Sequence, residues 1–428
     1  MFLIFDTEPT GLPKRWNAPL SDTENWPRCI QIAWQLHDIN GVLIEHEDYL
    51  IQPEGFNVPY DAEKIHGIST ELASKDGVPL KDVIERFQKA LSKTKFIVGQ
   101  NLGFDNNIMG AEFIRLGIEN PLLNYQVLDT CTETTAQLCQ LPGGRGGKFK
   151  LPTLSELHTF LFNHPFSEAH NATADVEATT RCFLELIRRK IYSVDELQVE
   201  PDYFETFNKF NPEPIKLIGL KHINLKKASD RIRKEIASIS NEEEEVSSDT
   251  IDKNIAGLEK VSFAHLHNHS QFSILQSTSS TQNLIKATAD NNMPAVALTD
   301  SGNMMGAFHF VMQVNNYNKT LSEEDSSKKI KAIVGCEFFV CEDHLNKNHK
   351  DNGYQIVLLA KNKNGYHNLA KMSSIAFTDG FYYVPRIDKK IIEKYKEDIM
   401  VLSGSLYGEI PNKLLNIGEK QAEEALVW

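Results

Sequence analysis

Short apolar runs alternate with amphipathic segments over the first 190 or so residues. The runs at 2–5, 30–38 and 95–99 have the length and composition of buried strands. Residues 82–91 and 174–190 instead repeat their apolar positions at helical spacing. This alternation of strand and helix predicts an α/β domain with packed layers over residues 1–195.

The pattern weakens after residue 190 and then resumes. Residues 239–250 contain four consecutive glutamates among serine, asparagine and aspartate, so we predict a linker over 196–258, acidic and disordered around 239–253. A second α/β pattern predicts a domain of βα units, barrel-like and incomplete, over 259–428. In this domain we expect a helix over 283–292. The buried strands are expected at 263–267, 294–300, 332–340, 354–362 and 399–405.

The two ends of the chain and its composition bound the class of protein. The helical pattern of residues 419–428 stops without a terminating residue, so we expect a chain cut short of its natural end. Of the 428 residues, 45 are basic and 58 acidic, and a net charge of −13 excludes a basic nucleic-acid coat. Six scattered cysteines and no long apolar run predict a cytoplasmic protein without a signal peptide or membrane contact.

Two acidic residues follow the first predicted strand. Asp6 and Glu8 are two positions apart, so strand alternation sends both side chains to one face. Like charges at that spacing repel, and a hard cation such as Mg²⁺, which prefers oxygen ligands, offsets the repulsion. The pair predicts a metal site, with a solvated strand end as the alternative.

Two further segments place acids at the starts of predicted helices. Asp105 follows the strand at 95–99, at a strand-to-helix junction of the kind where active sites of α/β folds gather. An acid that favours the helix dipole is the alternative there. Asp175 lies at the start of the helix expected over 174–190, and His170 lies five residues earlier. At this spacing a neutral His170 could act as a base close to Asp175, which the helix holds in place as a metal ligand. For an isolated histidine, a surface or capping role is the alternative.

Taken in order, the segments FDTE, NLGFD and HNATAD resemble the three signatures of the DEDDh family of 3′→5′ exonucleases, which is related to the proofreading subunit of bacterial replicases. The resemblance covers about residues 1–190 and implies an RNase H-like fold with a mixed sheet. Pro9 departs from it, because the family commonly has threonine there and proline lacks the backbone N–H.

The exonuclease resemblance also implies a mechanism. Asp6, Glu8 and Asp175 would hold one Mg²⁺ or Mn²⁺. Asp6 would bridge to a second ion that Asp105 helps to position, and His170 would take the proton from water. Two such ions stabilise the attacking and leaving oxygens of an in-line displacement, and the product would be a nucleoside 5′-monophosphate.

Three histidines of the second domain, His265, His267 and His269, recur at every second position and so share one face of a predicted strand. They predict either a Zn²⁺ or Mn²⁺ site or histidines satisfied by their neighbours. Segments from about Val261 to the end resemble the PHP domain that opens the bacterial DNA polymerase III alpha subunit.

Metal-binding PHP domains carry further ligands at five positions, which here are Gln276, Ser301, Glu337, Gln355 and Ser405. Only the glutamate keeps a charge. His267, His269, Asp300 and Glu337 are the residues expected to hold a residual ion weakly. We therefore predict a PHP domain with a structural role and no trinuclear hydrolytic centre.

The leading hypothesis is a proofreading exonuclease fused to the front of a replicative DNA polymerase, acting on single-stranded or mispaired DNA 3′ ends. Other replicase subunits, such as the sliding clamp, would bind parts of the protein beyond this chain. The alternatives are a free-standing exonuclease acting on RNA or in repair, and a non-catalytic docking module. Basic residues that could meet a phosphate backbone are Lys14, Arg15, Arg145 and Lys148–Lys150.

Overall fold

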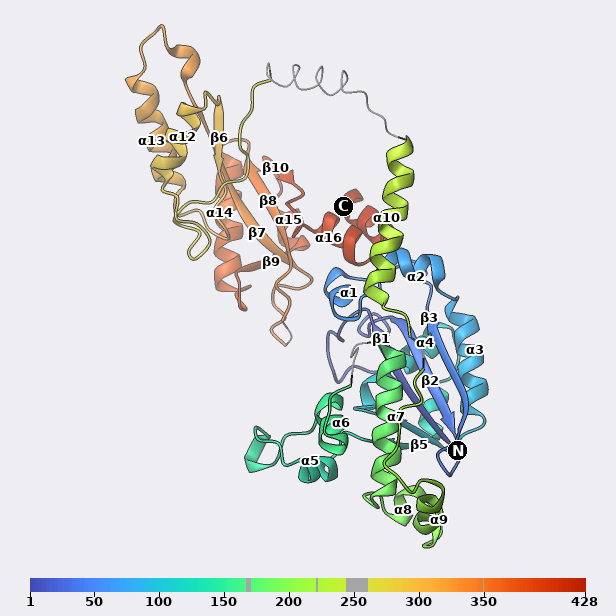
Figure 1. The fold of residues 1–428 in the computed structure, drawn as a ribbon. Coiled ribbons are helices and arrows are strands. Elements are labelled where there is room, and N and C mark those ends of the chain that lie inside the picture. The colour runs from blue at the N-terminus through green and yellow to red at the C-terminus, as the bar shows by residue number, and fades with distance from the viewer. Residues whose placement is uncertain (167–170, 221, 244–260, 349) are drawn as a thin grey trace. The chain divides into compact units, whose positions relative to one another are not determined.

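The computed structural model describes residues 1–166, 171–220, 222–243, 261–348 and 350–428. The chain divides into two compact units, Met1–Glu243 and Glu244–Trp428 (Figure 1). Each unit has its own sheet and its own hydrophobic cores.

The first unit is built on a mixed five-stranded sheet in the order β3-β2-β1-β4-β5. Its strands are β1 Phe2–Pro9, β2 Cys29–His37, β3 Leu43–Leu50, β4 Phe96–Gly99 and β5 Gln126–Asp129. Strand β1 pairs antiparallel with β2 and parallel with β4, so the sheet is mixed. The helices are α1 Tyr60–His66, α2 Thr70–Asp76, α3 Leu80–Leu91, α4 Gly103–Arg115, α5 Glu133–Cys139, α6 Leu154–Phe162, α7 Ala172–Arg188, α8 Val194–Leu197, α9 Tyr203–Phe210 and α10 Leu225–Glu243.

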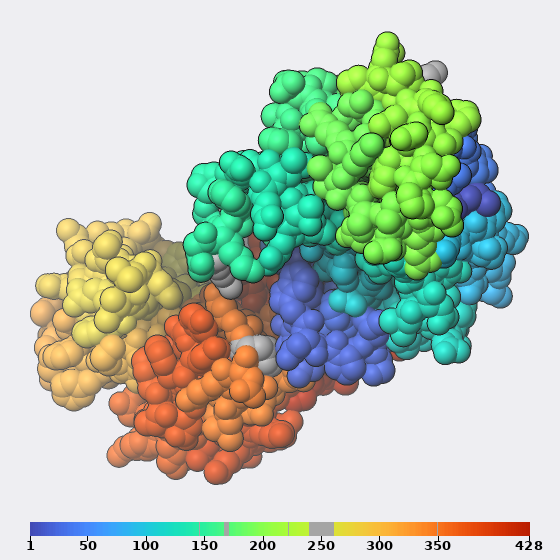
Figure 2. Space-filling model, turned by 90° about the horizontal axis from the view of Figure 1, so that it is seen from below, coloured from blue at the N-terminus to red at the C-terminus, as the bar shows by residue number. Residues whose placement is uncertain are grey.

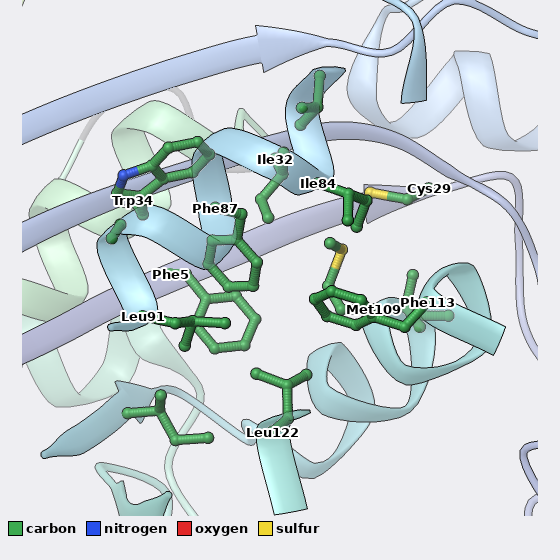
Figure 3. Packing of buried hydrophobic residues seen from close by; sticks show 14 of the residues in the cluster. Phe5, Cys29, Ile32, Trp34, Ile84, Phe87, Leu91, Met109, Phe113 and Leu122 are labelled. Carbon is green, nitrogen blue, oxygen red and sulfur yellow. The ribbon is translucent and has the colours of Figure 1, made fainter. Parts of the chain in front are cut away.

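Helices cover both faces of this sheet. On one face, α3 and α4 contribute to a core in which Phe5 lies edge-on to Phe87, with ring centroids 5.2 Å apart (Figure 3). On the other face, α7 packs its buried side against Phe2 and Ile4. The strands and helices expected at 2–5, 30–38, 95–99, 82–91 and 174–190 are therefore present, and the mixed α/β architecture expected for this unit is confirmed.

The described part of the expected linker differs from the prediction, because residues 196–243 include helices α9 and α10. Phe207 of α9 is fully buried against α7. Ser229 of α10 accepts a hydrogen bond from the Ser69 amide at 3.0 Å and donates one to the Gly67 carbonyl at 2.7 Å. Most side chains of these helices are polar, and the apolar stripe of each is narrow, so the sequence did not predict them. Both helices belong to the first unit. Residues 244–260 lie outside the described residues.

The second unit has a sheet in the order β10-β8-β7-β6, with β9 paired to β7. The strands are β6 Ala295–Leu298, β7 Lys331–Cys341, β8 Tyr354–Ala360, β9 Arg386–Asp388 and β10 Ile399–Leu402. Its helices are α12 Thr281–Asp290, α13 Ala307–Thr320, α14 Lys363–Thr378, α15 Lys389–Tyr395, α16 Glu409–Asn416 and α17 Glu419–Val427. Strand β7 runs parallel to β6 and β9 but antiparallel to β8.

The histidine segment does not form the regular strand that we predicted over 263–267. His265 makes one isolated bridge with Val296, and further along the Thr299 amide donates to the Asn268 carbonyl at 2.9 Å. The Asn268 amide bonds to the Thr299 hydroxyl instead of to a backbone carbonyl, at 2.9 Å, which breaks the regular pairing.

Among the described residues, no helix is both long and apolar enough to cross a membrane.

Candidate active site

The side chains of β1 alternate between the two faces of the sheet, and this alternation builds the site. Leu3 and Phe5 point into the core that includes α4, whereas Phe2 and Ile4 point into the core that includes α7. Continued to the end of the strand, the alternation gives Asp6 and Glu8 to the α7 face and Thr7 to the α4 face.

Three carboxylates meet on the α7 face. Asp6, Glu8 and Asp175 each offer an oxygen, and these oxygens lie within 4.8 Å of one another. Glu8 is buried, whereas Asp6 and Asp175 are partly exposed, so the group is open to solvent on one side. Three oxygen ligands so arranged fit a hard divalent cation.

Two polar side chains hold the start of α7, which carries Asp175. The Asn171 side chain caps the helix by accepting from the Thr173 amide at 3.1 Å. Gln31, opposite Glu8 in the β1–β2 ladder, accepts from the Ala172 amide at 3.2 Å. The helix start is thereby tied to the same strand pair that carries the other two acids.

The fourth acid, Asp105, comes from the opposite face. It lies in the first turn of α4 and is 5% exposed. One carboxylate oxygen accepts from the Thr7 amide at 3.0 Å and from the Thr7 hydroxyl at 2.6 Å. Thr7 therefore joins Asp105 to the strand that presents Asp6 and Glu8, while Asp105 itself lies outside the close set of three.

Asp129, at the end of β5, holds the turn between β4 and α4. Its carboxylate accepts from the amides of Asn101 and Leu102, each at 2.8 Å, and from the Cys131 amide at 2.7 Å. Asn101 has a φ of 59°, a left-handed conformation that is uncommon for a residue with a side chain. The hydrogen bonds that the Asp129 carboxylate accepts stabilise this turn, which sets the position of Asp105.

Burial and mutual repulsion raise the pKa of these acids. Burial raises the pKa of Asp6 well above its ordinary value, and Asp105, Asp175 and Glu8 raise it further. Burial, with Asp175 and Asp105 as smaller contributors, raises the pKa of Glu8 to about 8. Burial also raises the pKa of Asp105 to about 7, although the hydrogen bonds from Thr7 oppose the shift. The site thus favours the binding of positive charge.

His170, the predicted base, lies outside the described residues. The Arg145 side chain also lies outside what is described, and the remaining basic residues named from the sequence divide into two groups. Lys14 and Arg15 are exposed in the segment after β1. Lys148 and Lys150 pair with acids, Glu133 and Glu156.

The second unit brings together part of the expected histidine site. His267, His269 and Glu337 offer ligand atoms within 4.8 Å of one another, and the nearest pair, His267 Nε2 and Glu337 Oε2, is 2.9 Å apart. The other Glu337 oxygen is buried without a hydrogen-bond partner. Burial works against ionisation, but the two imidazoles lower the pKa of Glu337 to about 2.

Asp300, the fourth expected ligand, is not in this cluster. Its buried carboxylate accepts from the Ser270 amide at 2.7 Å and from the hydroxyls of Ser270 and Ser273 at 2.8 and 2.7 Å. These three donors tie the histidine segment to the end of β6. His265 is exposed and makes an edge-on ring contact with Phe263.

Comparison with protein families gives two matches that divide the chain as the two units do. Residues 3–183 match the Exonuclease family model, and residues 265–428 match the PHP domain model. The chain joins an exonuclease domain to a PHP domain. The exonuclease match includes Asp6, Glu8, Asp105 and Asp175, and the PHP match includes the His267, His269 and Glu337 cluster.

The similar proteins are much longer than this chain. The DNA polymerase III subunit alpha of Treponema pallidum is 40% identical over 169 residues, which are 39% of this chain and 14% of that protein. The subunit of the same name from Thermus aquaticus is 37% identical over 163 residues, 36% of this chain and 12% of that protein. The matched region is thus about an eighth of the length of these relatives.

Solved structures of exonucleases are among those that match. Escherichia coli exonuclease I in complex with a dT13 oligonucleotide has a TM-score of 0.36 and 22% identity, and the match covers 44% of this chain and 40% of that one. A 3′-exonuclease that recognises a histone mRNA stem-loop has a TM-score of 0.34 and 11% identity, over 44% of this chain and 81% of that one.

Sequence reasoning named the carboxylates of the exonuclease domain but did not assign roles to Thr7 and Gln31. Both are polar residues inside strands that are otherwise buried. A buried polar side chain needs a hydrogen-bond partner, and that requirement was the available signal.

Proposed function

We propose that the exonuclease domain is a Mg²⁺-dependent 3′→5′ DNA exonuclease that releases nucleoside 5′-monophosphates and serves in proofreading. The observation that carries this proposal is the set of three oxygens from Asp6, Glu8 and Asp175, with Asp105 anchored beside it by Thr7. The Exonuclease family match supports the reaction class.

The donor set fits divalent cations. Asp6, Glu8 and Asp175 would hold one ion, and Asp6 with Asp105 would take part in holding a second. When bound, Mg²⁺ or Mn²⁺ would supply the positive charge that makes water a better nucleophile and that stabilises the leaving 3′-oxygen. The raised pKa values of Asp6, Glu8 and Asp105 agree with this assignment, because carboxylates crowded and buried in this way need a counter-charge to ionise together.

The chain's own residues would divide the remaining work. Asp105 is held by Thr7 on one oxygen, and the other oxygen would face the site. Asp175 is fixed by a capped helix, and Asp6 and Glu8 by a central strand, so little reorganisation is needed when substrate binds. His170 would accept the proton of the attacking water.

The names of the relatives extend the proposal to the parent protein. We propose that this chain is the front part of a replicative polymerase alpha subunit in the cytoplasm, with DNA 3′ ends as substrate and other replicase subunits as partners. Mispaired ends separate more easily than paired ends, so a site that takes single strands would favour errors. The boundaries 1–195 for the exonuclease domain and 259–428 for the PHP domain remain predictions.

We propose a structural role for the PHP domain. Asp300 accepts three hydrogen bonds within the protein, so of the four expected ligands His267, His269 and Glu337 are left for an ion. Three ligands of this kind suit a single Zn²⁺ or Mn²⁺ and not a multinuclear hydrolytic centre.

The substrate is tested with three 5′-labelled strands of equal length: a DNA primer paired to its template, the same primer with a mismatched 3′ end, and an RNA strand. The proposal predicts ladders that shorten from the 3′ end, fastest for the mismatched primer. Preference for the RNA strand would support the alternative of an RNA-processing exonuclease. Shortening from the 5′ end would contradict the proposal.

A further inference from the structure

Trp16 is a large exposed aromatic side chain in the segment between β1 and β2. It is 61% exposed, and its only described ring contact is with Phe104, at 5.6 Å between centroids and a tilt of 47°. Phe104 directly precedes Asp105 in α4. The exposed indole therefore lies next to the helix turn that carries one of the four acids.

The segment that carries Trp16 is held in place by the buried side chain of Asn25. The Asn25 side chain accepts from the Arg15 amide at 2.8 Å and donates to the Arg15 carbonyl at 3.0 Å. The Asn25 backbone carbonyl accepts from the Lys14 amide at 3.1 Å. These bonds fix the backbone next to Trp16, so the exposure of the ring is not the result of a loose chain.

The same segment is close to the acids along the chain and carries positive charge. It begins directly after β1, which ends at Pro9, and the early part of the chain is seen in blue on the surface in Figure 2. Lys14 and Arg15 are exposed there, and Arg15 is paired with Asp22 at 2.8 Å. An exposed aromatic ring next to cations is the combination that binds single-stranded nucleic acid, by stacking on bases and attracting phosphates.

We propose that Trp16, supported by Phe104, is a stacking platform for a base of the single strand that enters the exonuclease site. The indole would cover one face of the base, and Lys14 would meet the neighbouring phosphate. Stacking on a π-face is tolerant of base identity, so the platform would accept any sequence. This inference rests on the proposed function only in naming which strand is bound.

Binding of a 5′-labelled twelve-nucleotide oligo(dT) is the test, measured by fluorescence anisotropy in EDTA so that no strand is consumed. We expect Trp16→Ala to weaken binding about five- to hundredfold, the range found for single base–aromatic stacks. Trp16→Phe should recover most of the loss. The matched control is Phe210→Ala, because Phe210 is an aromatic residue with a similar exposed fraction, 63%. Phe210 ends α9, and Tyr203 of the same helix bonds to the turn between β2 and β3. That turn lies at the end of the sheet where β1 begins, whereas the acids follow at the other end of β1.

An abasic strand of the same length separates stacking from charge. It should bind wild type and Trp16→Ala equally, because there is no base to stack. The proposal is overturned if wild type does not bind oligo(dT), if Trp16→Ala binds it as tightly as wild type, or if Trp16→Ala weakens abasic binding by the same factor. Base-dependent binding by a protein that releases no mononucleotides would leave the platform in place and refute the proposed function instead.

Discussion

A single strand residue, Thr7, connects acids that reach the site from opposite faces of the sheet. Asp6 and Glu8 extend from β1 toward the face of the sheet that α7 covers, whereas Asp105 extends from α4 on the other face. No single helix could therefore present all three acids. The Thr7 hydroxyl and amide both bond to the same Asp105 oxygen. The geometry of the fourth acid therefore depends on a residue that takes no part in the chemistry.

Replacing Thr7 with valine tests this role. Valine keeps the shape of threonine and the backbone amide but loses the hydroxyl, so the Asp105 carboxylate is held less firmly. We expect kcat for mononucleotide release to fall about tenfold, which is near the upper end of the free energy of one hydrogen bond. Thr7→Ser should retain most of the rate. Steady-state kinetics with Mg²⁺ titration gives the comparison, and a wild-type kcat in Thr7→Val would refute the role.

The buried acids also predict how the metal-free protein responds to pH. The pKa of Glu8 is raised from 4.5 to about 8, so folding favours its protonated form. Stability in EDTA should therefore be greatest at acidic pH near 4.5 and fall as pH rises toward 8. Glu8→Gln removes this titration and should stabilise the metal-free protein at pH 8 by about 2–4 kcal/mol, since one pKa unit is worth about 1.4 kcal/mol.

Denaturant unfolding in EDTA at pH 5 and pH 8 measures the effect. Glu85→Gln, on the exposed side of α3, is the control and should leave the pH profile unchanged. Equal stabilisation by Glu8→Gln at both pH values would contradict the assignment of a raised pKa.

At the scale of elements, periodicity was a good guide where a segment has one clear apolar face. Helices α3 and α7 were predictable for that reason, whereas strand β1 was predictable as a short continuous apolar run, because it is buried on both faces of the sheet. Helix α10 was not, because its apolar stripe is narrow and its other faces are charged. Among its residues whose burial is described, Leu225 and Ile232 are the apolar ones buried in a core. The carboxylate set was predictable from order and spacing, whereas the Thr7 and Asp129 contacts join residues 98 and 27–28 positions apart and needed the fold.

Helix α10 is expected to stabilise the exonuclease domain. Ser229→Val leaves the Ser69 amide and the Gly67 carbonyl without their partner in a buried place, at a cost of about 1–3 kcal/mol. Ser238→Ala, on the exposed side of the same helix, is the control. Thermal unfolding should show a lower Tm for Ser229→Val alone, and equal Tm values for both variants would show that α10 does not support the domain.

At the scale of the whole molecule, the carboxylates proposed for catalysis lie in the first compact unit, and the cluster of His267, His269 and Glu337 lies in the second. We propose catalysis for the first of these sites alone. Glu337→Gln should therefore leave the kcat of mononucleotide release within about twofold of wild type, while loss of the bond to His267 lowers the Tm. Metal analysis of purified protein and a phosphatase assay complete the comparison. Phosphatase activity that survives Asp6→Ala would show that the PHP domain is catalytic and would contradict its structural role.

The net charge of −13 has a different meaning once the site is known. Part of the excess comes from the glutamate run at 242–245, and part comes from acids that surround a proposed cation site. A chain of this net charge can still bind the end of a nucleic acid where bound divalent cations neutralise the acidic side chains. The affinity of such binding should depend strongly on salt concentration.

The most direct test of the central claim is mononucleotide release from a single-stranded DNA 3′ end as a function of Mg²⁺ concentration, for wild type, Asp6→Ala and Asp82→Ala. Asp82 is exposed in the first turn of α3 and takes no part in the site. The account predicts Mg²⁺-dependent release by wild type and Asp82→Ala, and loss of at least about a thousandfold in Asp6→Ala, within the range of catalytic charge stabilisation. Release by Asp6→Ala at the wild-type rate would contradict it.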